Sequence, residues 1–373
     1  MNKLTDANAI HEAGTKAIRS SSFKRSTILF EMNHLLETAK IQKAIADSSY
    51  EPEPVVKFEI NERGKTRLIS SNTIRDKAIN HLLCDEILTP SIKPLLILDN
   101  SASQKGKGVA FHRERLTRHL RQYYTKHGND GYILLIDFSG YYANILHDKC
   151  LEDMAEALKK NKDLSPEDRE KAMEMLKKIM DSFGLNGKGV DIGNQCSQNI
   201  GVFYPHRIDN RAKICGVKGY GRYSDDSYVI SDSKKELKEI LEKIREEAEC
   251  YGIIINEKKT RICKLSSEWR HLQIQYSLTG TGRIIHKINP KAATRERRKL
   301  RAYRRLLDKG TMKQEEIDEC FRSWLGGNYK NMSKVQIYGI IRLYYKLFER
   351  RLTWKRKHGR LRWLTEQALK DLR

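Results

Sequence analysis

The sequence lacks the long apolar runs, paired cysteines and proline-rich stretches that are typical of several protein classes. No uninterrupted apolar run approaches the roughly 18 residues of a membrane span, and residues 1–6 lack the apolar core of a signal peptide. The seven cysteines are scattered and never spaced as Cys-x-x-Cys, which predicts reduced thiols rather than zinc ligands or a disulfide framework. With seven prolines in 373 residues, no long flexible linker is expected. These absences predict a folded cytoplasmic protein with no membrane partner.

Positive charge is what the sequence has in excess. Lysine and arginine total 71 against 48 for aspartate and glutamate, which gives a formal net charge of +23. Residues 291–373 hold 24 of the basic residues and 9 of the acidic ones, so this segment alone carries +15. Basic side chains gain affinity for phosphates by releasing condensed counterions. A polyanion is therefore the expected partner, and the alternative is a protein that is merely very soluble.

The order of the predicted elements indicates an α+β fold rather than a doubly wound sheet. The first fifty residues have the apolar spacing of helices, with apolar positions at Ile18, Ile28, Leu29, Met32, Leu35 and Leu36. Strands are expected at 55–60 and 65–70, and helices at about 74–88, 111–124, 148–160 and 165–183. A capping box of Ser233 and Glu236 predicts the start of a charged helix that ends near Tyr251.

Three aspartates at the ends of predicted strands are the candidate catalytic residues. An apolar run at 132–136, typical of a strand buried on both faces, ends at Asp137. Residues 220–230 predict a hairpin with Asp225 and Asp226 at its tip. Adjacent carboxylates repel each other unless a cation neutralises them. Three carboxylates on two neighbouring strands would hold two Mg²⁺ ions about 4 Å apart, as in-line phosphoryl transfer requires.

Six segments resemble, in the same order, the sequence motifs of reverse transcriptases. They are the fingers motif at Gly64–Ile69 with Arg75 and Asp76, the first palm motif at Ile136–Ile145, the second at Ile192–Gln198, the third at Tyr223–Asp226, the fourth at Gly252–Thr260, and the primer-gripping hairpin region at Leu272–Tyr276. Retroviral and group II intron enzymes usually carry Gln and Pro where this chain has Ile192 and Gln198. The sequence is therefore most similar to prokaryotic and phage reverse transcriptases, notably those of diversity-generating retroelements and antiviral defence systems.

The resemblance implies an α+β right-hand polymerase with fingers and palm built from an antiparallel sheet plus helices. Its expected parts are a helical N-terminal extension at 1–50, fingers and palm at 51–286, and a basic helical thumb at 287–373. The implied activity is RNA-directed DNA synthesis, in which a primer 3′-hydroxyl attacks the α-phosphate of a dNTP between two Mg²⁺ ions, with Mn²⁺ as a possible substitute.

The same resemblance assigns the catalytic roles. Asp137 and Asp225 would bridge both metal ions, Asp226 would support them, and the carbonyl oxygen of Phe138 would complete one coordination shell. Lys259 occupies the place of a lysine that protonates the leaving pyrophosphate. Its neighbour Lys258 is an alternative for that role.

The resemblance also assigns nucleotide and nucleic-acid contacts. Lys65 and Arg67 would clamp the incoming triphosphate, and Tyr142 would exclude a 2′-hydroxyl by its bulk. The expected nucleotide pocket further includes Ile192, Gly193, Gln195 and Ser197. A side chain at position 193 would intrude on the template and nucleotide. On the predicted thumb helix, the residues expected along one face toward the nucleic-acid backbone are Arg297, Arg301, Arg304 and Arg305.

The expected partners are an RNA template (a cognate structured non-coding RNA), a DNA or RNA primer or the cDNA, dNTPs, and an accessory protein or a second copy of the chain. Two alternative functions are open at this point. One is template-independent or protein-primed DNA synthesis in a defence system. The other is a non-catalytic RNA-binding protein on a polymerase scaffold, which the retained aspartates and fingers cations disfavour.

Overall fold

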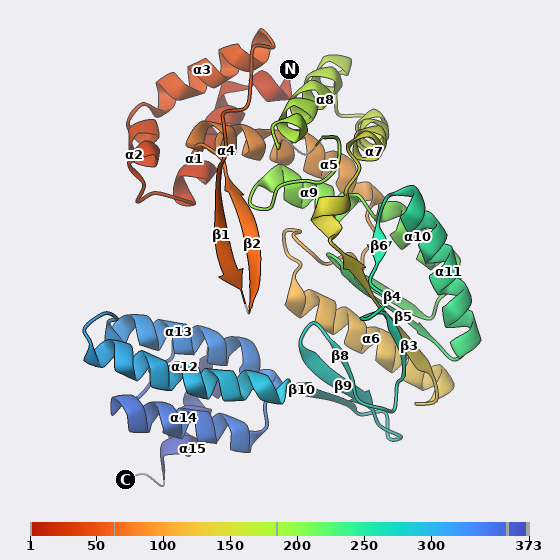
Figure 1. The fold of residues 1–373 in the computed structure, drawn as a ribbon, viewed down its shortest axis with the longest axis vertical. Coiled ribbons are helices and arrows are strands. Elements are labelled where there is room, and N and C mark those ends of the chain that lie inside the picture. The colour runs from red at the N-terminus through yellow and green to blue at the C-terminus, as the bar shows by residue number, and fades with distance from the viewer. Residues whose placement is uncertain (1, 63, 184–185, 356–357, 371–373) are drawn as a thin grey trace. The chain divides into compact units, whose positions relative to one another are not determined.

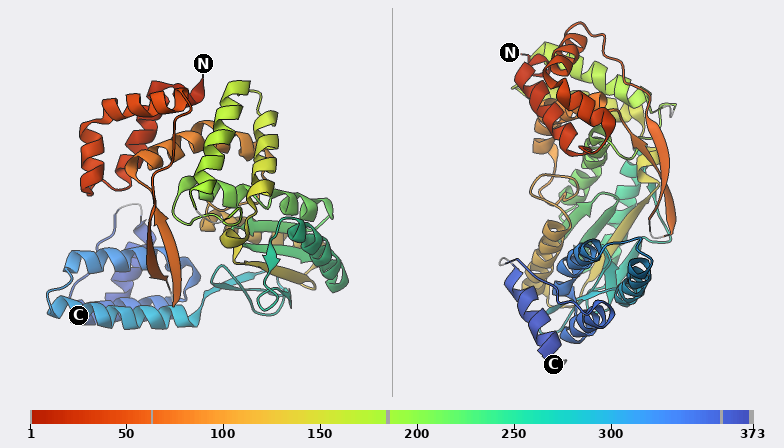
Figure 2. Two further views of the ribbon diagram at one scale, coloured as in Figure 1. Left: turned by 45° about the horizontal axis from the view of Figure 1, so that its top comes forward. Right: turned by 90° about the vertical axis from the view of Figure 1, so that its left-hand side faces the viewer.

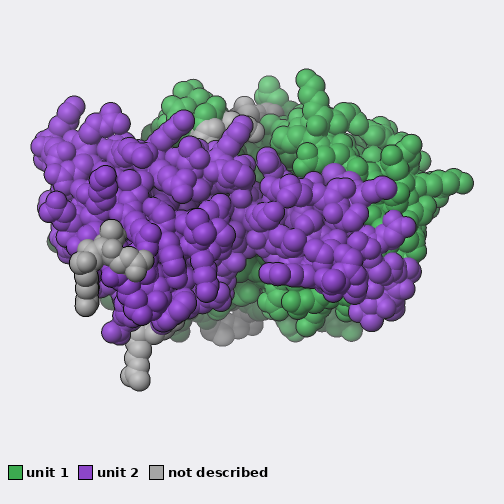
Figure 3. All heavy atoms as spheres, turned by 90° about the horizontal axis from the view of Figure 1, so that it is seen from below, with its two compact units in different colours: residues 1–123, 131–262 green, residues 124–130, 263–373 purple. Residues whose placement is uncertain are grey.

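The computed structural model describes residues 2–62, 64–183, 186–355 and 358–370. The chain divides into two compact units, one of residues 1–123 and 131–262 and the other of residues 124–130 and 263–373, which Figure 3 shows in two colours. The architecture is α+β, with antiparallel sheets and many helices, as predicted. Within the described residues, none of the helices combines the length and the apolar character that crossing a membrane would need.

The first unit begins with helices, as the apolar spacing predicts. After the short 3₁₀ helix η1 (Lys3–Thr5) come α1 (Ala7–Arg19), α2 (Arg25–Met32) and α3 (His34–Ala46), drawn in red in Figure 1. However, five of the six apolar positions that suggested these helices are exposed, namely Ile28, Leu29, Met32, Leu35 and Leu36. The buried face of α2 and α3 instead contains Thr27, Phe30, Thr38, Ile41 and Ile45.

A two-stranded hairpin follows. Strands β1 (Val56–Glu62) and β2 (Lys65–Ser71) pair antiparallel, from Val56 opposite Ser71 to Glu62 opposite Lys65, and Figure 2 shows this orange ribbon from two further sides. The strands agree with the predicted ones to within two residues. At the base of the hairpin, the N–H of Ser70 donates to the carbonyl oxygen of Ile192, 2.9 Å away. This hydrogen bond ties β2 to the segment that precedes helix α9 (Gln195–Phe203).

The chain then enters the helical body of the first unit. Its next elements are α4 (Ile74–Leu82), a π-helical stretch η2 (Leu83–Leu88), α5 (Thr89–Ile92), the 3₁₀ helix η3 (Lys93–Leu95) and α6 (Val109–His127). Further along are η4 (Tyr141–Asn144), α7 (His147–Lys160), α8 (Pro166–Asp181), α10 (His206–Ile214) and α11 (Lys234–Cys250). Ser165 caps α8 by accepting from the N–H of Asp168, so the Ser-Pro-Glu signal for a helix start is confirmed.

The central sheet has five strands, of which four follow the order β4-β5-β3-β6 and the fifth, β7, also pairs with β3. The strands are β3 (Tyr132–Ser139), β4 (Gly219–Tyr223), β5 (Asp226–Ser231), β6 (Ile254–Ile255) and β7 (Arg261–Lys264). Residues 133–138 of β3 are all buried, because α6 covers one face of the sheet and α10 and α11 cover the other. On β5, Tyr228 contacts His119 of α6, and on β4 Tyr220 donates to Asp209 of α10. The predicted double burial of β3 is confirmed.

The predicted capping box of α11 forms only in part. The hydroxyl of Ser233 accepts from the N–H of Glu236 at 3.3 Å, as expected. The carboxylate of Glu236 does not return to the N–H of Ser233, because it accepts instead from the hydroxyl of Ser231. That hydroxyl oxygen in turn accepts from the N–H of Ser233 at 3.0 Å. The hydroxyl of Ser231 therefore bridges the N–H of Ser233 and the carboxylate of Glu236, which would bond directly in a complete capping box.

The second unit has its own sheet and its own helical core. After β7 (Arg261–Lys264), strands β8 (Trp269–His271), β9 (Ile274–Leu278) and β10 (Ile284–Ile288) form a three-stranded antiparallel sheet. The helices are α12 (Pro290–Asp308), α13 (Gln314–Asn328), η5 (Tyr329–Asn331), α14 (Lys334–Phe348) and α15 (Gly359–Leu369), blue in Figure 1. Their shared core includes Leu300, Ile317, Phe321, Leu325, Ile340 and Tyr344.

Candidate active site

The three candidate aspartates lie together at one end of the central sheet. Asp137 on β3 is directly opposite Asp226 on β5. Strands β4 and β5 are joined by the two-residue turn of Ser224 and Asp225, since Tyr223 pairs with Asp226. The N–H of Phe138 donates to the carbonyl oxygen of Asp225 at 3.1 Å, which fixes the turn beside β3. The register thus brings together three carboxylates that lie as far as 89 positions apart in the sequence.

Burial and mutual repulsion raise the pKa values of two of these carboxyl groups. The pKa of Asp226 is raised to about 7, first by burial and then by the charges of Asp225 and Asp137. The pKa of Asp225 is raised for the same reasons, against the opposing charges of Lys259 and Arg67. Carboxylate oxygens are the donors that hard divalent cations prefer, and such a cation would relieve this repulsion. The three carboxylates are therefore ligands of the type that a divalent metal ion prefers.

Asp137 is held by residues of the loop after β6. The ammonium Nζ of Lys259 lies 2.8 and 2.6 Å from the two carboxylate oxygens of Asp137, and Nδ2 of Asn256 donates to Oδ1 at 3.0 Å. The neighbouring Lys258 is exposed. Within the part of the chain that the structure describes, no three Asp, Glu, His or Cys side chains form a group that could hold a metal ion. The charge of Asp137 is neutralised by Lys259 instead.

A buried ion pair supports the turn that carries Asp225. Both Arg222 and Asp209 are completely buried, and Arg222 donates from Nε and Nη2 to the two oxygens of Asp209, each at 2.8 Å. Nη2 also donates to the carbonyl oxygen of Val202 at 2.8 Å. Nη1 donates to the carbonyl oxygen of Ser224 at 3.1 Å. Because Ser224 has a positive φ of 56°, this contact holds a strained residue next to Asp225.

The ring of Tyr142 lies between the turn and α9. Burial raises the pKa of its hydroxyl, and the nearby Ser224 opposes this shift. A Cβ atom added at Gly201 of α9 would lie 2.8 Å from the ring, so the glycine makes room for it. The adjacent Tyr141 donates to the carbonyl oxygen of Gly201 at 2.6 Å. Tyr142 is therefore half-buried and fixed beside Asp225, which is the position that a residue sensing the sugar would need.

Gly193 has no room for a side chain within the protein itself. Its φ is +132°, and a Cβ atom built there would overlap the carbonyl oxygen of Ser70 and lie 3.1 Å from Cγ2 of Ile69. Both residues belong to β2. The backbone of the hairpin is therefore one obstacle to a side chain, and the predicted approach of template and nucleotide to Gly193 stays a prediction.

The side chains of the other residues of the predicted nucleotide pocket point in different directions. The side chain of Ile192 is partly exposed. Gln195 donates from Nε2 to Asp85 at 3.0 Å, so its amide points into the protein. Ser197 is 1% exposed, and among the described residues its hydroxyl has no hydrogen-bond partner. Asn194, which sequence reasoning did not single out, caps α9 by accepting from the N–H of Ser197 at 2.7 Å.

The two predicted triphosphate clamps lie on β2. Arg67 is opposite Ile60 and is exposed. Its positive charge partly offsets the rise in the pKa of Asp225 that burial causes. This electrostatic effect places its guanidinium within range of the carboxylates. The backbone of Lys65 pairs with Glu62, whereas the side chain of Lys65 lies outside the described part of the structure.

Residues 55–276 match the protein family described as "Reverse transcriptase (RNA-dependent DNA polymerase)". The chain belongs to the reverse transcriptase family. The matched segment contains all three aspartates, Lys259 and the β1–β2 hairpin, so these features belong to a nucleotidyltransferase domain. Reverse transcriptase domains generally use divalent metal ions, which agrees with the donor set of this site.

One solved structure of telomerase shares the fold of this reverse transcriptase, and two others are similar to it more weakly. Apo telomerase from Candida tropicalis is 13% identical, with a TM-score of 0.51 over 86% of this chain and 66% of that one. Telomerase from Candida albicans in complex with a TWJ fragment of telomeric RNA is 11% identical, with a TM-score of 0.49 over 86% of this chain and 62% of that one. A C. tropicalis telomerase truncated from its C-terminal domain is 15% identical, with a TM-score of 0.49 over 65% and 58%.

This likeness concerns the fold alone, because the identities are low. The reverse transcriptase chain spans about three fifths to two thirds of the length of these telomerase chains. No curated protein sequence matches it significantly.

Three of the four candidate arginines of α12 are exposed, and one is not. Arg301, Arg304 and Arg305 are exposed. Arg304 also donates to the carbonyl oxygen of Leu347 at 2.9 Å and pairs with Asp308 within its own helix. Arg297 is half-buried next to Gly339 of α14, because it follows the buried Ala293 by four residues and borders the packed face. Their contact with the nucleic-acid backbone stays a prediction.

The main residues of this reverse transcriptase that sequence reasoning missed are Arg222, Asp209 and Asn256. One signal was available for the first of them. Arg222 lies in the β-forming run Gly219–Tyr223, and an arginine in a strand that is buried needs an acidic partner. The identity of that partner could not be read from the sequence, because Asp209 lies on a different element.

Proposed function

We propose that the chain is an RNA-directed DNA polymerase that copies a cognate RNA into cDNA by two-metal nucleotidyl transfer. The observation that supports this most directly is the register of β3, β4 and β5, which gathers Asp137, Asp225 and Asp226 at one point next to Lys259. A structural role does not explain why three buried or half-buried carboxylates lie together, two of which, Asp225 and Asp226, have raised pKa values.

The proposed metal ligands are Asp137, Asp225 and the carbonyl oxygen of Phe138, with Asp226 in support. Two divalent ions, Mg²⁺ or Mn²⁺, would lower the pKa of the primer 3′-hydroxyl and neutralise charge on the phosphates. The chain's own residues orient the reactants. Lys259 is paired with Asp137, which raises its pKa and keeps it protonated before substrate binds. It would then exchange this pairing for the departing pyrophosphate and donate a proton to it.

Nucleotide selection is proposed to depend on β2 and η4. Arg67 is close enough for its charge to act on Asp225, so it would bind the triphosphate on that side, together with Lys65. Tyr142, near Ser224 and packed on Gly201, would block a 2′-hydroxyl. Ile192 is the exposed pocket residue and would contact the nascent base pair, whereas Gln195 and Ser197 would shape the pocket from behind.

We further propose the division into an N-terminal extension at 1–50, fingers and palm at 51–286, and a thumb at 287–373. The basic helices of the second unit, with Arg301 and Arg305 exposed on α12, would bind the primer–template backbone. The proposed partners are RNA, primer and dNTPs, in the cytoplasm. The proposed role is diversity generation or antiviral defence in a bacterium or phage, on the resemblance of the Ile192–Gln198 segment.

The test is primer extension by the purified chain with Mg²⁺, on an RNA template, on a DNA template and without template. Asp225→Asn removes metal-binding charge with little change in volume, so it should abolish extension while RNA binding persists. The matched control is Asp163→Asn, at an exposed position, which should retain full activity. Extension without template would favour the template-independent alternative. Full activity of Asp225→Asn would refute the catalytic assignment, and no synthesis under any condition would favour a non-catalytic RNA-binding protein.

A further inference from the structure

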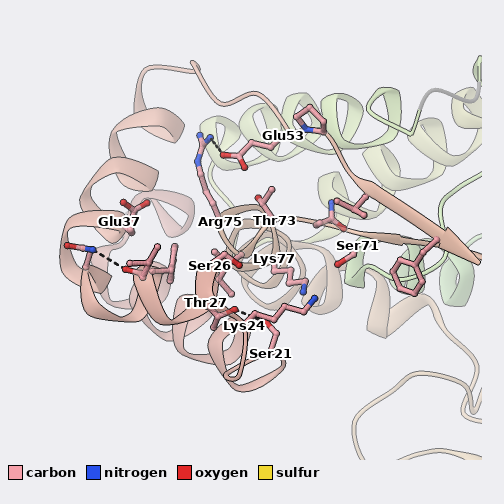
Figure 4. Close-up of a pocket in the computed structure, with 18 residues that line it drawn as sticks. Ser21, Lys24, Ser26, Thr27, Glu37, Glu53, Ser71, Thr73, Arg75 and Lys77 are labelled. Carbon is pink, nitrogen blue, oxygen red and sulfur yellow. Dashed lines mark hydrogen bonds and ion pairs between the residues drawn. The ribbon is translucent and has the colours of Figure 1, made fainter.

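A groove of about 700 Å³ lies within the first unit, away from the residues of the aspartate centre. It is formed by α2, the base of the β1–β2 hairpin and the start of α4, as Figure 4 shows. Its volume is in the range of sites that bind small molecules. None of its lining residues belongs to the proposed metal site or to the proposed dNTP pocket.

The charges in this groove do not balance. Its two acidic residues are each paired, since Glu53 lies 3.3 Å from Arg75 and Glu37 lies 2.7 Å from Lys40. Two lysines remain, Lys24 and Lys77. Among the described residues, neither has a carboxylate within ion-pair distance. The groove therefore presents two cations that lack a counter-charge from the protein.

The charges of these two lysines act on each other. Figure 4 shows the side chains of Lys24 and Lys77 extending toward the same part of the groove. The pKa of Lys77 is lowered, first by burial and then by the charge of Lys24. Two ammonium groups that repel each other are stabilised when an anion binds between them, and a phosphate group accepts hydrogen bonds from both.

A polar atom in the wall of the groove also lacks a partner. Asn72 lines the groove and is 8% exposed. Among the described residues, no donor reaches its Oδ1 atom. A buried acceptor without a hydrogen bond is destabilising, and a ligand with an N–H group would satisfy it. Carboxamide side chains are suited to the edges of nucleobases.

The remaining wall is apolar. Val56 and Phe58 on β1 and Leu29 on α2 line the groove and are 67%, 46% and 51% exposed. An exposed aromatic ring that lines the same groove as the two lysines provides a surface for the stacking of a base. A simple inorganic anion would use neither this surface nor Asn72.

We propose that this groove binds a nucleoside phosphate, with the phosphate between Lys24 and Lys77, the base against Phe58, and a base N–H donated to Oδ1 of Asn72. This site goes beyond the proposed polymerase function, because it shares no residue with the aspartate centre. The same chemistry is present in a free nucleotide and in one nucleotide of a single-stranded RNA, so the experiment must distinguish these two sources.

The test measures binding to the full chain in EDTA, so that metal-dependent binding at the aspartates does not contribute. The probes are a fluorescent N-methylanthraniloyl derivative of AMP and a labelled oligo(U) of about ten nucleotides, a length typical of single-strand sites. Lys24→Gln and Lys77→Gln should each weaken probe binding by about tenfold. Phe58→Ala should weaken it as well. Lys235→Gln, at an exposed lysine of α11, is the matched control and should have no effect.

Each result supports or overturns the proposal. Binding of the AMP probe that the lysine variants weaken identifies a free nucleotide as sufficient ligand. Failure of AMP to bind, combined with lysine-dependent binding of oligo(U), identifies a strand as the source. If the lysine variants bind both probes as Lys235→Gln does, the proposal is wrong. Because Asp225→Asn should retain this binding while losing polymerisation, failure of one proposal is distinguishable from failure of the other.

Discussion

Replacing Arg222 by methionine should destabilise the protein strongly, because it leaves Asp209 charged and buried. In the folded chain Asp209 accepts two hydrogen bonds from Arg222 and one from the hydroxyl of Tyr220, 2.7 Å away. Arg222→Met removes the two charge-assisted bonds and keeps only the third. Breaking a completely buried ion pair from one side typically costs 3–5 kcal/mol. We expect a loss of about that size in the free energy of unfolding, measured by urea denaturation at neutral pH.

The matched control is Arg211→Met, at an exposed arginine of α10, which should change stability by less than about 0.5 kcal/mol. The double variant Arg222→Met with Asp209→Leu separates stability from positioning. Replacing both members of a buried pair by apolar residues is often neutral, so most of the lost stability should return. The polymerisation rate should not return, because the carbonyl oxygen of Ser224 still lacks its donor. A loss below about 1 kcal/mol in the single variant, or full kcat in the double variant, would refute this reasoning.

Three further predictions concern other parts of the site. Tyr142→Ala should lower the ratio of kcat/KM for dNTP over rNTP by roughly tenfold or more, whereas an unchanged ratio would mean that the ring only packs against Gly201. Gly193→Ala should raise the KM for dNTP and cost about 1–3 kcal/mol of stability, since the methyl group meets the backbone of β2; a wild-type KM and melting temperature would contradict this. Neutralising Arg301 and Arg305 to glutamine should flatten the slope of log K against log salt for primer–template binding by roughly 1.4–1.8, with single-nucleotide kcat unchanged. A fall in kcat at constant slope would indicate a structural role for α12.

The parts of the fold that the sequence predicted are those in which local pattern and tertiary burial agree. The apolar run that ends at Asp137 and the hairpin around Asp225 are confirmed because a doubly buried strand and a tight turn each have a strong local signature. Periodicity predicted helices in the first fifty residues but not which face is buried. It marked Met32 and Leu35, which are 76% and 77% exposed.

The features that sequence reasoning did not reveal are contacts between elements far apart in the sequence. A Cβ atom at position 193 would overlap the carbonyl oxygen of Ser70, more than a hundred residues earlier. The exposed Arg304 donates to the carbonyl oxygen of Leu347, which lies on another helix. A helical-wheel argument that uses one helix at a time cannot detect either contact.

The division of the chain into units has a practical consequence for expressing fragments. The second unit takes a short piece, residues 124–130, from the middle of the sequence. Within that unit the hydroxyl of Tyr124 donates to the carbonyl oxygen of Gly280 at 2.7 Å, and its ring packs so closely on Gly282 that a methyl group there would lie 2.8 Å from Cδ1. A fragment that starts at Cys263 would leave the turn between β9 and β10 without this anchor. Limited proteolysis that cuts only near residue 262 should leave the two products associated. The N-terminal product would still contain residues 124–130, whose Tyr124 contacts Gly280 and Gly282 of the C-terminal product.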